Sequence, residues 1–202
     1  MSYRGQNYSR LLGMPGFTDE SMNIHFKLYE GYVGHFNEMI DILNGTDRDN
    51  PAYDAIKEKF AWDFNGVRLH EAYFGNLTKD YKALNPDSGL AREMVKTYGS
   101  LESWANDFWE VSSTRGAGWA VLAWDPEGKS LINLWIKGHE VGTLFYCVSL
   151  LVNDCFDHAY MTDYGDDRSD YAEAFLKVID WVEVQKRFDS VVQLSREAEY
   201  AL

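Results

Sequence analysis

The stretch of sequence that decides the fold spans residues 154–160 and reads Asp154-Cys155-Phe156-Asp157-His158-Ala159-Tyr160. It follows the run 144–152, which is rich in β-forming residues and predicts the strongest strand of the chain. Asp154 and His158 stand four residues apart at the exit of that strand. A carboxylate and an imidazole together suit a transition metal such as iron or manganese. Because pairs at this spacing are common by chance, the spacing alone only raises the hypothesis of a metal site.

Two shorter β-rich runs, 119–124 and 131–136, precede that strand. The turn Asp125-Pro126-Glu127-Gly128 separates them, and such a short connection favours antiparallel pairing. Helices are expected from Ser100 to about residue 113 and from about residue 169 onward. This part of the chain therefore predicts a small antiparallel sheet with helices around it.

The N-terminal part of the chain predicts two long helices. Thr18 can cap the first helix, which runs to about residue 43, and the second begins after Pro51. His25 and Tyr32 lie seven residues apart on the first helix, so they share one face. Two long helices in succession predict a hairpin.

The turn at residues 84–87 gives the predicted boundary between two domains. We expect a helical hairpin domain over residues 1–87 and an α/β domain over residues 88–202.

A chain of 202 residues with 46% hydrophobic composition can bury a core of its own, so no disulfide or zinc site is needed to explain its folding.

The charge and the apolar runs limit the partners that we expect. A formal net charge of −13 argues against binding to nucleic acid or to an anionic membrane. The sequence has no apolar run of about 18 residues and no signal-type segment, so a cytoplasmic protein is expected. Cys147 and Cys155 are not at metal-ligand spacings, and we interpret them as reduced thiols.

The segment 154–160 resembles the Asp-x-Trp-Glu-His-Ala-Tyr signature of the iron/manganese superoxide dismutases. Upstream, Gly116-Ala117-Gly118-Trp119 is similar to the Gly-Ser-Gly-Trp element of that family, and residues 70–77 are similar to its His-x-x-Tyr-Trp-x-x-Leu segment. Downstream, the chain has further residues in the order and spacing of the family, namely Asp163, Tyr164, Arg168, Asp170, Tyr171, Glu173, Ala174, Phe175 and Trp181. The resemblance spans nearly the whole chain.

The resemblance implies an α+β fold, in which a helical hairpin is followed by an α/β domain with a small three-stranded antiparallel sheet. It implies superoxide dismutation at one iron or manganese ion per chain, with the ligands His25, His70, Asp154 and His158. His25 stands seven residues before Tyr32, which is one residue fewer than the interval usual in the family. The sequence does not distinguish iron from manganese.

Three further residues take catalytic roles by the same resemblance. Tyr32 corresponds to the tyrosine at the gateway of the site, although a plain aromatic in the hairpin seam is the alternative. His139 stands where some members have a glutamine, and we expect it to replace that glutamine with an imidazole that can titrate near neutral pH; the alternative is an exposed loop histidine. Arg168 corresponds to the arginine of the substrate funnel, and its alternative is a surface ion pair with Asp166 or Asp170.

Superoxide is therefore the expected substrate, and a homodimer is the expected assembly. Three residues depart from the family pattern of that dimer, namely Asp157, Met161 and Tyr29, so its bridging contacts must differ. Three rival hypotheses remain open at this point: a repurposed or non-catalytic metal protein on the same scaffold, a non-haem iron oxygenase, and a helical interaction module without metal.

Overall fold

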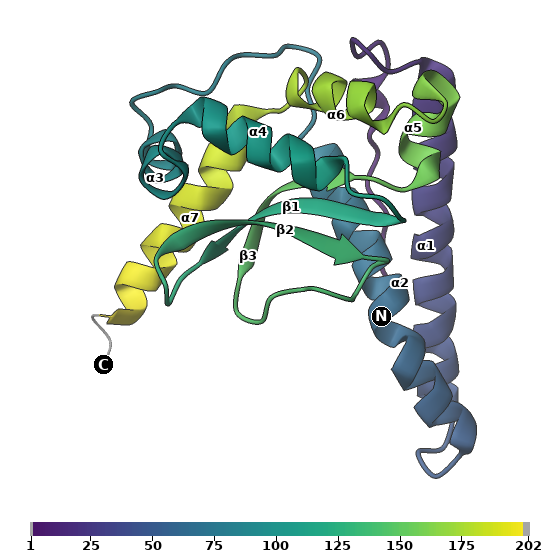
Figure 1. Cartoon of the computed structure of the whole chain (residues 1–202). Coiled ribbons are helices and arrows are strands. Elements are labelled where there is room, and N and C mark those ends of the chain that lie inside the picture. Colours follow the sequence, from purple (N-terminus) through teal and green to yellow (C-terminus); the bar gives the residue numbers. More distant parts are fainter. Residues whose placement is uncertain (1, 200–202) are drawn as a thin grey trace.

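The computed structural model describes residues 2–199. After a short 3₁₀ helix at Ser9–Leu11, two long helices, α1 (Asp19–Gly45) and α2 (Pro51–Gly75), form an antiparallel hairpin (Figure 1). Thr18 caps α1 by accepting a hydrogen bond from the backbone of Ser21. Asn50 caps α2 in the same way, and Pro51 occupies its first turn. The predicted hairpin is confirmed.

The sheet has three antiparallel strands in the order β2-β1-β3. They are β1 (Gly118–Asp125), β2 (Ser130–Lys137) and β3 (Val148–Asp154). The predicted start of the last strand at residue 144 is wrong. The segment before β3 is a loop in which Phe145 is 87% exposed, and Tyr146 has a φ of 64°, a left-handed conformation that a strand cannot contain.

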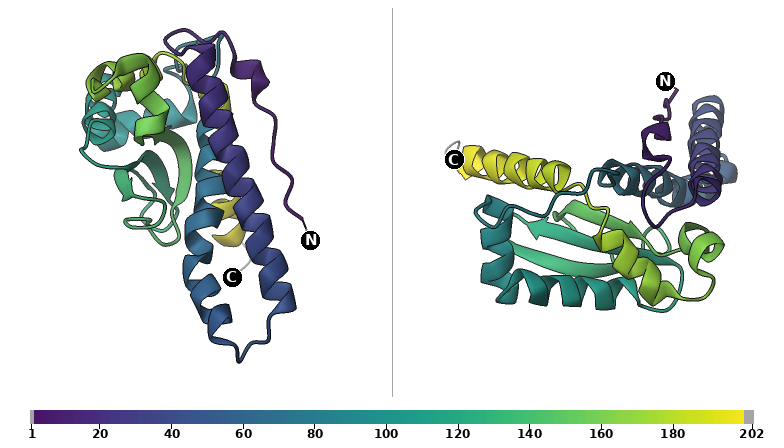
Figure 2. Two further views of the ribbon diagram at one scale, coloured as in Figure 1. Left: turned by 90° about the vertical axis from the view of Figure 1, so that its right-hand side faces the viewer. Right: turned by 90° about the horizontal axis from the view of Figure 1, so that it is seen from above.

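Five more helices cover the sheet and one end of the hairpin. They are α3 (Gly89–Tyr98), α4 (Leu101–Ser112), α5 (Asp157–Tyr164), α6 (Arg168–Leu176) and α7 (Trp181–Glu199). Figure 2 shows α4 on one side of the sheet and α2 with α7 on the other. The predicted C-terminal helical region is thus two helices. Across residues 2–199, we find no helix that is both long and apolar enough to cross a membrane.

A buried asparagine joins the hairpin to the sheet. Asn76, directly after α2, is fully buried, and its amide nitrogen donates to the backbone oxygen of Val152 at 3.2 Å. Its amide oxygen accepts from the backbone nitrogen of the same residue at 2.9 Å. The side chain therefore pairs with the free edge of β3 as a neighbouring strand would. This contact places the end of β3 against the C-terminal turns of α2, which is where the polar site lies.

Candidate metal centre

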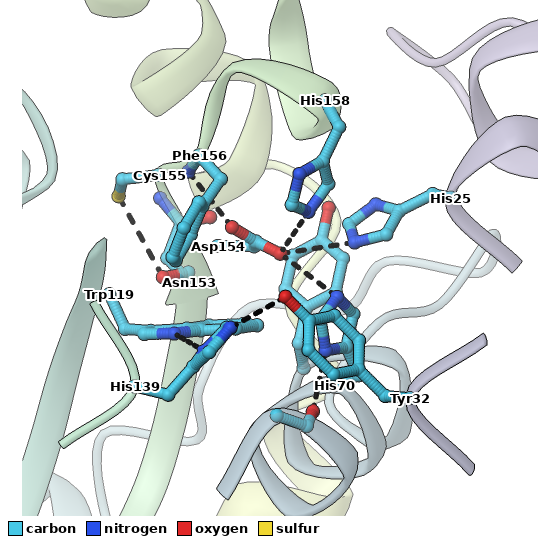
Figure 3. A network of polar contacts seen from close by, with 12 residues as sticks. His25, Tyr32, His70, Trp119, His139, Asn153, Asp154, Cys155, Phe156 and His158 are labelled. Atoms are coloured by element: carbon cyan, nitrogen blue, oxygen red, sulfur yellow. Dashed lines mark hydrogen bonds and ion pairs between the residues drawn. The ribbon is translucent and has the colours of Figure 1, made fainter. Parts of the chain in front are cut away.

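Four side chains from four different elements converge at the junction of the hairpin and the sheet (Figure 3). His25 lies on α1, His70 on α2, Asp154 at the end of β3 and His158 on α5. Their ligand atoms all lie within 4.8 Å of one another. The Nε2 atoms of His25, His158 and His70 are 3.0, 3.1 and 3.6 Å from the Asp154 Oδ2 atom.

Three of these groups are fully buried and His158 is partly buried, and this burial affects their charge. Burial lowers the pKa of His70 to about 3 and lowers that of His25, so both imidazoles stay neutral. Burial alone raises the pKa of Asp154, but His158 and His25 outweigh it and hold that pKa well below its usual range. Burial opposes charge on His158 as well, yet Asp154 raises its pKa overall. The centre therefore contains an ionised carboxylate surrounded by imidazoles.

The His70 ring shows that the cluster fits a cation. Its Nδ1 atom donates to the backbone oxygen of Gly66 at 2.6 Å, which fixes Nε2 as the unprotonated nitrogen. That buried Nε2 atom has no hydrogen-bond partner among the described residues, and it faces the Asp154 carboxylate. A lone pair that faces an anion is unfavourable unless a cation lies between them. Three imidazole nitrogens and a carboxylate oxygen form a donor set that suits iron or manganese.

Aromatic rings surround the four groups. Phe74 lies 4.8 Å from the His25 ring, and Trp119 lies 5.0 Å from the His70 ring, both measured between ring centroids. Tyr73 stacks on His25 at 5.2 Å, and Phe156 stacks on His158 at 5.4 Å. These rings exclude bulk water and fix the orientations of the imidazoles.

A second set of polar contacts links the sheet to α1 beside this cluster. The Trp119 indole nitrogen donates to His139 Nδ1 at 3.0 Å, and His139 Nε2 lies 2.8 Å from the Tyr32 hydroxyl (Figure 3). Because an indole N–H can only donate, Nδ1 must be the acceptor. The neutral ring then carries its proton on Nε2 and donates it to the oxygen of Tyr32. The hydroxyl proton of Tyr32 remains free for another partner.

The structure buries His139 completely, so the alternative of an exposed loop histidine is wrong. Burial lowers its pKa to about 4. The expected titration near neutral pH is therefore not supported, because the ring is enclosed by Trp119, Phe156 and Trp62. Sequence reasoning missed this enclosure because the residues around the loop come from distant parts of the chain.

Arg168 lies farther out, at the start of α6. Its guanidinium donates to the backbone oxygens of Thr114 and Gly116, the second at 2.8 Å, and to the Tyr160 hydroxyl at 2.9 Å. The alternative was a surface ion pair with Asp166 or Asp170, whereas the carboxylate near its guanidinium is that of Asp157, at 3.9 Å. Arg168 therefore ties α5 and α6 to the turn before β1.

The structure also reveals supporting residues to which the sequence analysis gave no role. The buried Tyr171 hydroxyl hydrogen-bonds to the backbone oxygen of Asp154 at 2.6 Å and to Asn153 Oδ1 at 2.9 Å. Glu71, next to His70, is buried and accepts several hydrogen bonds. Tyr171 belongs to the family pattern already quoted, whereas no signal in the sequence pointed to Glu71.

Three imidazoles and one carboxylate at the junction of a helical hairpin and an antiparallel sheet define a class of metal-dependent oxidoreductase with one ion per site. Residues 86–187 match the family model described as iron/manganese superoxide dismutases, C-terminal domain. The chain belongs to the iron/manganese superoxide dismutase family.

Curated relatives support this assignment along most of the chain. A protein of Aquifex pyrophilus named superoxide dismutase [Fe] is 31% identical over 189 residues, which cover 89% of this chain and 88% of the relative. A superoxide dismutase [Fe] of Methanothermobacter marburgensis is 32% identical, with 88% and 90% covered. A superoxide dismutase [Mn] 2 of Haloferax volcanii is 32% identical, with 89% and 91% covered. The relatives named for iron and the relative named for manganese are thus about equally identical in sequence to this chain.

Gly66 provides a test of how closely the site is packed. A Cβ atom at this position would lie 2.6 Å from the Tyr32 ring, so Gly66→Ala must displace Tyr32. We expect the dismutation rate per bound metal to fall by about 10- to 100-fold, since small displacements near the reacting groups are costly. Gly34→Ala on α1 is the matched control, because nothing lies within 4 Å of its added Cβ. Equal rates in the two variants would contradict this role of Gly66.

Proposed function

We propose that this chain disproportionates superoxide to dioxygen and hydrogen peroxide at a single iron or manganese ion held by His25, His70, Asp154 and His158. The convergence of three imidazole nitrogens on one buried carboxylate is the observation that carries the proposal. When bound, the ion would supply the one-electron redox chemistry, accepting an electron from one superoxide and returning it to the next. The protein must hold that ion, exclude water and provide the two protons that peroxide requires.

Tyr32 and His139 are the groups that we propose for proton delivery. The donor order runs from Trp119 to His139 to Tyr32, which leaves the proton of the phenol available to the site. Burial raises the pKa of Tyr32 to about 12, so the phenol stays protonated at neutral pH and can donate a hydrogen bond. His139 fixes the orientation of that hydroxyl, and a fixed donor costs little reorganisation during the reaction.

We propose that Arg168 contributes local positive charge for an anionic substrate, although the chain has a net charge of −13. The Arg168 guanidinium bonds to the hydroxyl of Tyr160, and Tyr160 stands two residues after His158. The Arg168 side chain is only 13% exposed. If Arg168→Lys keeps the salt dependence of the rate while Arg168→Gln does not, charge is the property that matters. Equal salt dependence in both variants and the wild type would remove this role.

We also propose that the protein is a homodimer and that its location is cytoplasmic. We place the boundary between its two domains between residues 87 and 88. Met161 on α5 is 54% exposed, three residues after His158, and such an apolar residue suits a subunit contact beside the centre. Neither Cys147 nor Cys155 is in a disulfide, which suits a reducing compartment. The family-model match begins at residue 86, near the proposed boundary. A monomeric mass by light scattering would remove the dimer.

The direct test measures superoxide dismutation per bound ion on separately iron-loaded and manganese-loaded protein, with the metal content quantified in the same samples. We expect activity with one or both ions. His25→Ala should lose the ion, whereas His35→Ala should keep it, because His35 is an exposed histidine on the same helix. Full occupancy without activity would instead favour a repurposed metal protein on this scaffold.

The contact between His139 and Tyr32 gives a second test. In His139→Gln, the amide oxygen can accept from Trp119 and the amide nitrogen can donate to Tyr32, so we expect a rate close to that of the wild type. His139→Ala removes both contacts, and we expect a loss of about 100-fold. An alanine variant with an unchanged rate and pH profile would show that His139 takes no part in catalysis.

A further inference from the structure

Glu71 is a buried carboxylate next to a proposed metal ligand, yet it is not part of the metal cluster. The residue is 8% exposed. Its Oε1 atom accepts from the Tyr29 hydroxyl at 2.8 Å and from the Tyr3 hydroxyl at 2.7 Å. Its Oε2 atom accepts from Arg68 Nη1 at 2.9 Å. Burying a charge is costly unless donors surround it, so this arrangement needs all of these partners.

The position of these groups along the helices links them to the metal centre. Tyr29 follows His25 by four residues on α1, which is about one helical turn. Glu71 directly follows His70 on α2. The bond between Tyr29 and Glu71 therefore joins the two helices at the level where each presents an imidazole. The Tyr29 ring is 1% exposed and lies 6.2 Å from the His70 ring.

The N-terminal segment completes the network from outside the hairpin. The backbone nitrogen of Tyr3 donates to Asn37 Oδ1 at 2.6 Å, and its backbone oxygen accepts from Asn37 Nδ2 at 2.9 Å. The backbone nitrogen of Gln6 donates to the Tyr29 hydroxyl at 3.0 Å. Burial and the bond to Glu71 raise the pKa of Tyr3 to about 12, so its hydroxyl stays a donor. Figure 2 shows this segment running beside the hairpin.

We infer that Tyr29, Glu71 and Tyr3 form a positioning unit that fixes the separation of the two ligand helices, and that the N-terminal segment 3–6 closes it as a strap. The inference rests on the proposed function, because it takes His25 and His70 to be ligands. Loss of either hydroxyl leaves the carboxylate with an unfilled acceptor site. The carboxylate then gains by turning toward water, which loosens the contact between α1 and α2 and spreads the two imidazoles.

The test compares Tyr29→Phe and Tyr3→Phe with wild-type protein in two measurements on the metal-loaded full chain. Competition with a chelator should show about tenfold weaker metal binding in each variant, which is the usual scale for groups that support metal ligands. The absorption or electron paramagnetic resonance spectrum of the bound ion should also change, since the imidazoles shift. A general loss of stability would leave that spectrum unchanged in the molecules that keep their ion.

Tyr98→Phe is the matched control. It removes a tyrosine hydroxyl that accepts a hydrogen bond from the Asn133 backbone, away from the hairpin. Glu71→Gln should retain metal better than Glu71→Ala, because the amide oxygen still accepts from a tyrosine. If the wild type holds the ion and both tyrosine variants match Tyr98→Phe in metal affinity and spectrum, the inference is overturned, whereas the proposed function stands. A wild type that binds neither ion would remove the proposed function and the inference with it.

Discussion

The arrangement of the whole chain depends on the burial of one carboxylate, that of Asp154. A fully buried charge is tolerated only where opposite charge or polar groups surround it. Here the groups come from three separate helices, α1, α2 and α5, so all three must meet at the end of β3. Two of the three imidazoles, those of His25 and His70, are buried and neutral, so the cluster is a poor ion-pair network and a good cation site.

The sheet brings the metal cluster and the groups proposed for proton delivery close together. Trp119 pairs directly with Asp154 in the register between β1 and β3. The same residue donates to His139, which follows β2, and packs against His70. One tryptophan thus contacts a ligand through its ring and orients the histidine that contacts Tyr32. A change of register between these strands would disturb both sets of contacts at once, because the two share this side chain.

Much of the fold followed from local signals, whereas the surroundings of the site did not. The hairpin was predictable because Thr18 and Pro51 mark helix starts by capping chemistry. The interval from His25 to Tyr32 is one residue shorter than is usual in the family. Residues seven apart still lie on one face of a helix, and α1 is a continuous helix there. Glu71 could not be found in this way. A glutamate on a helix is usually solvated, and its burial depends on donors at positions 3 and 29, which no local pattern reveals.

X-ray absorption at the metal edge, on protein with its metal content measured, tests the central claim most directly. The account predicts one ion per chain, with the scattering of three imidazole rings and one carboxylate oxygen around it. Replacement of Asp154 by asparagine should remove the ion or change that shell. An ion bound without imidazole scattering, or an identical shell in Asp154→Asn, would contradict the account.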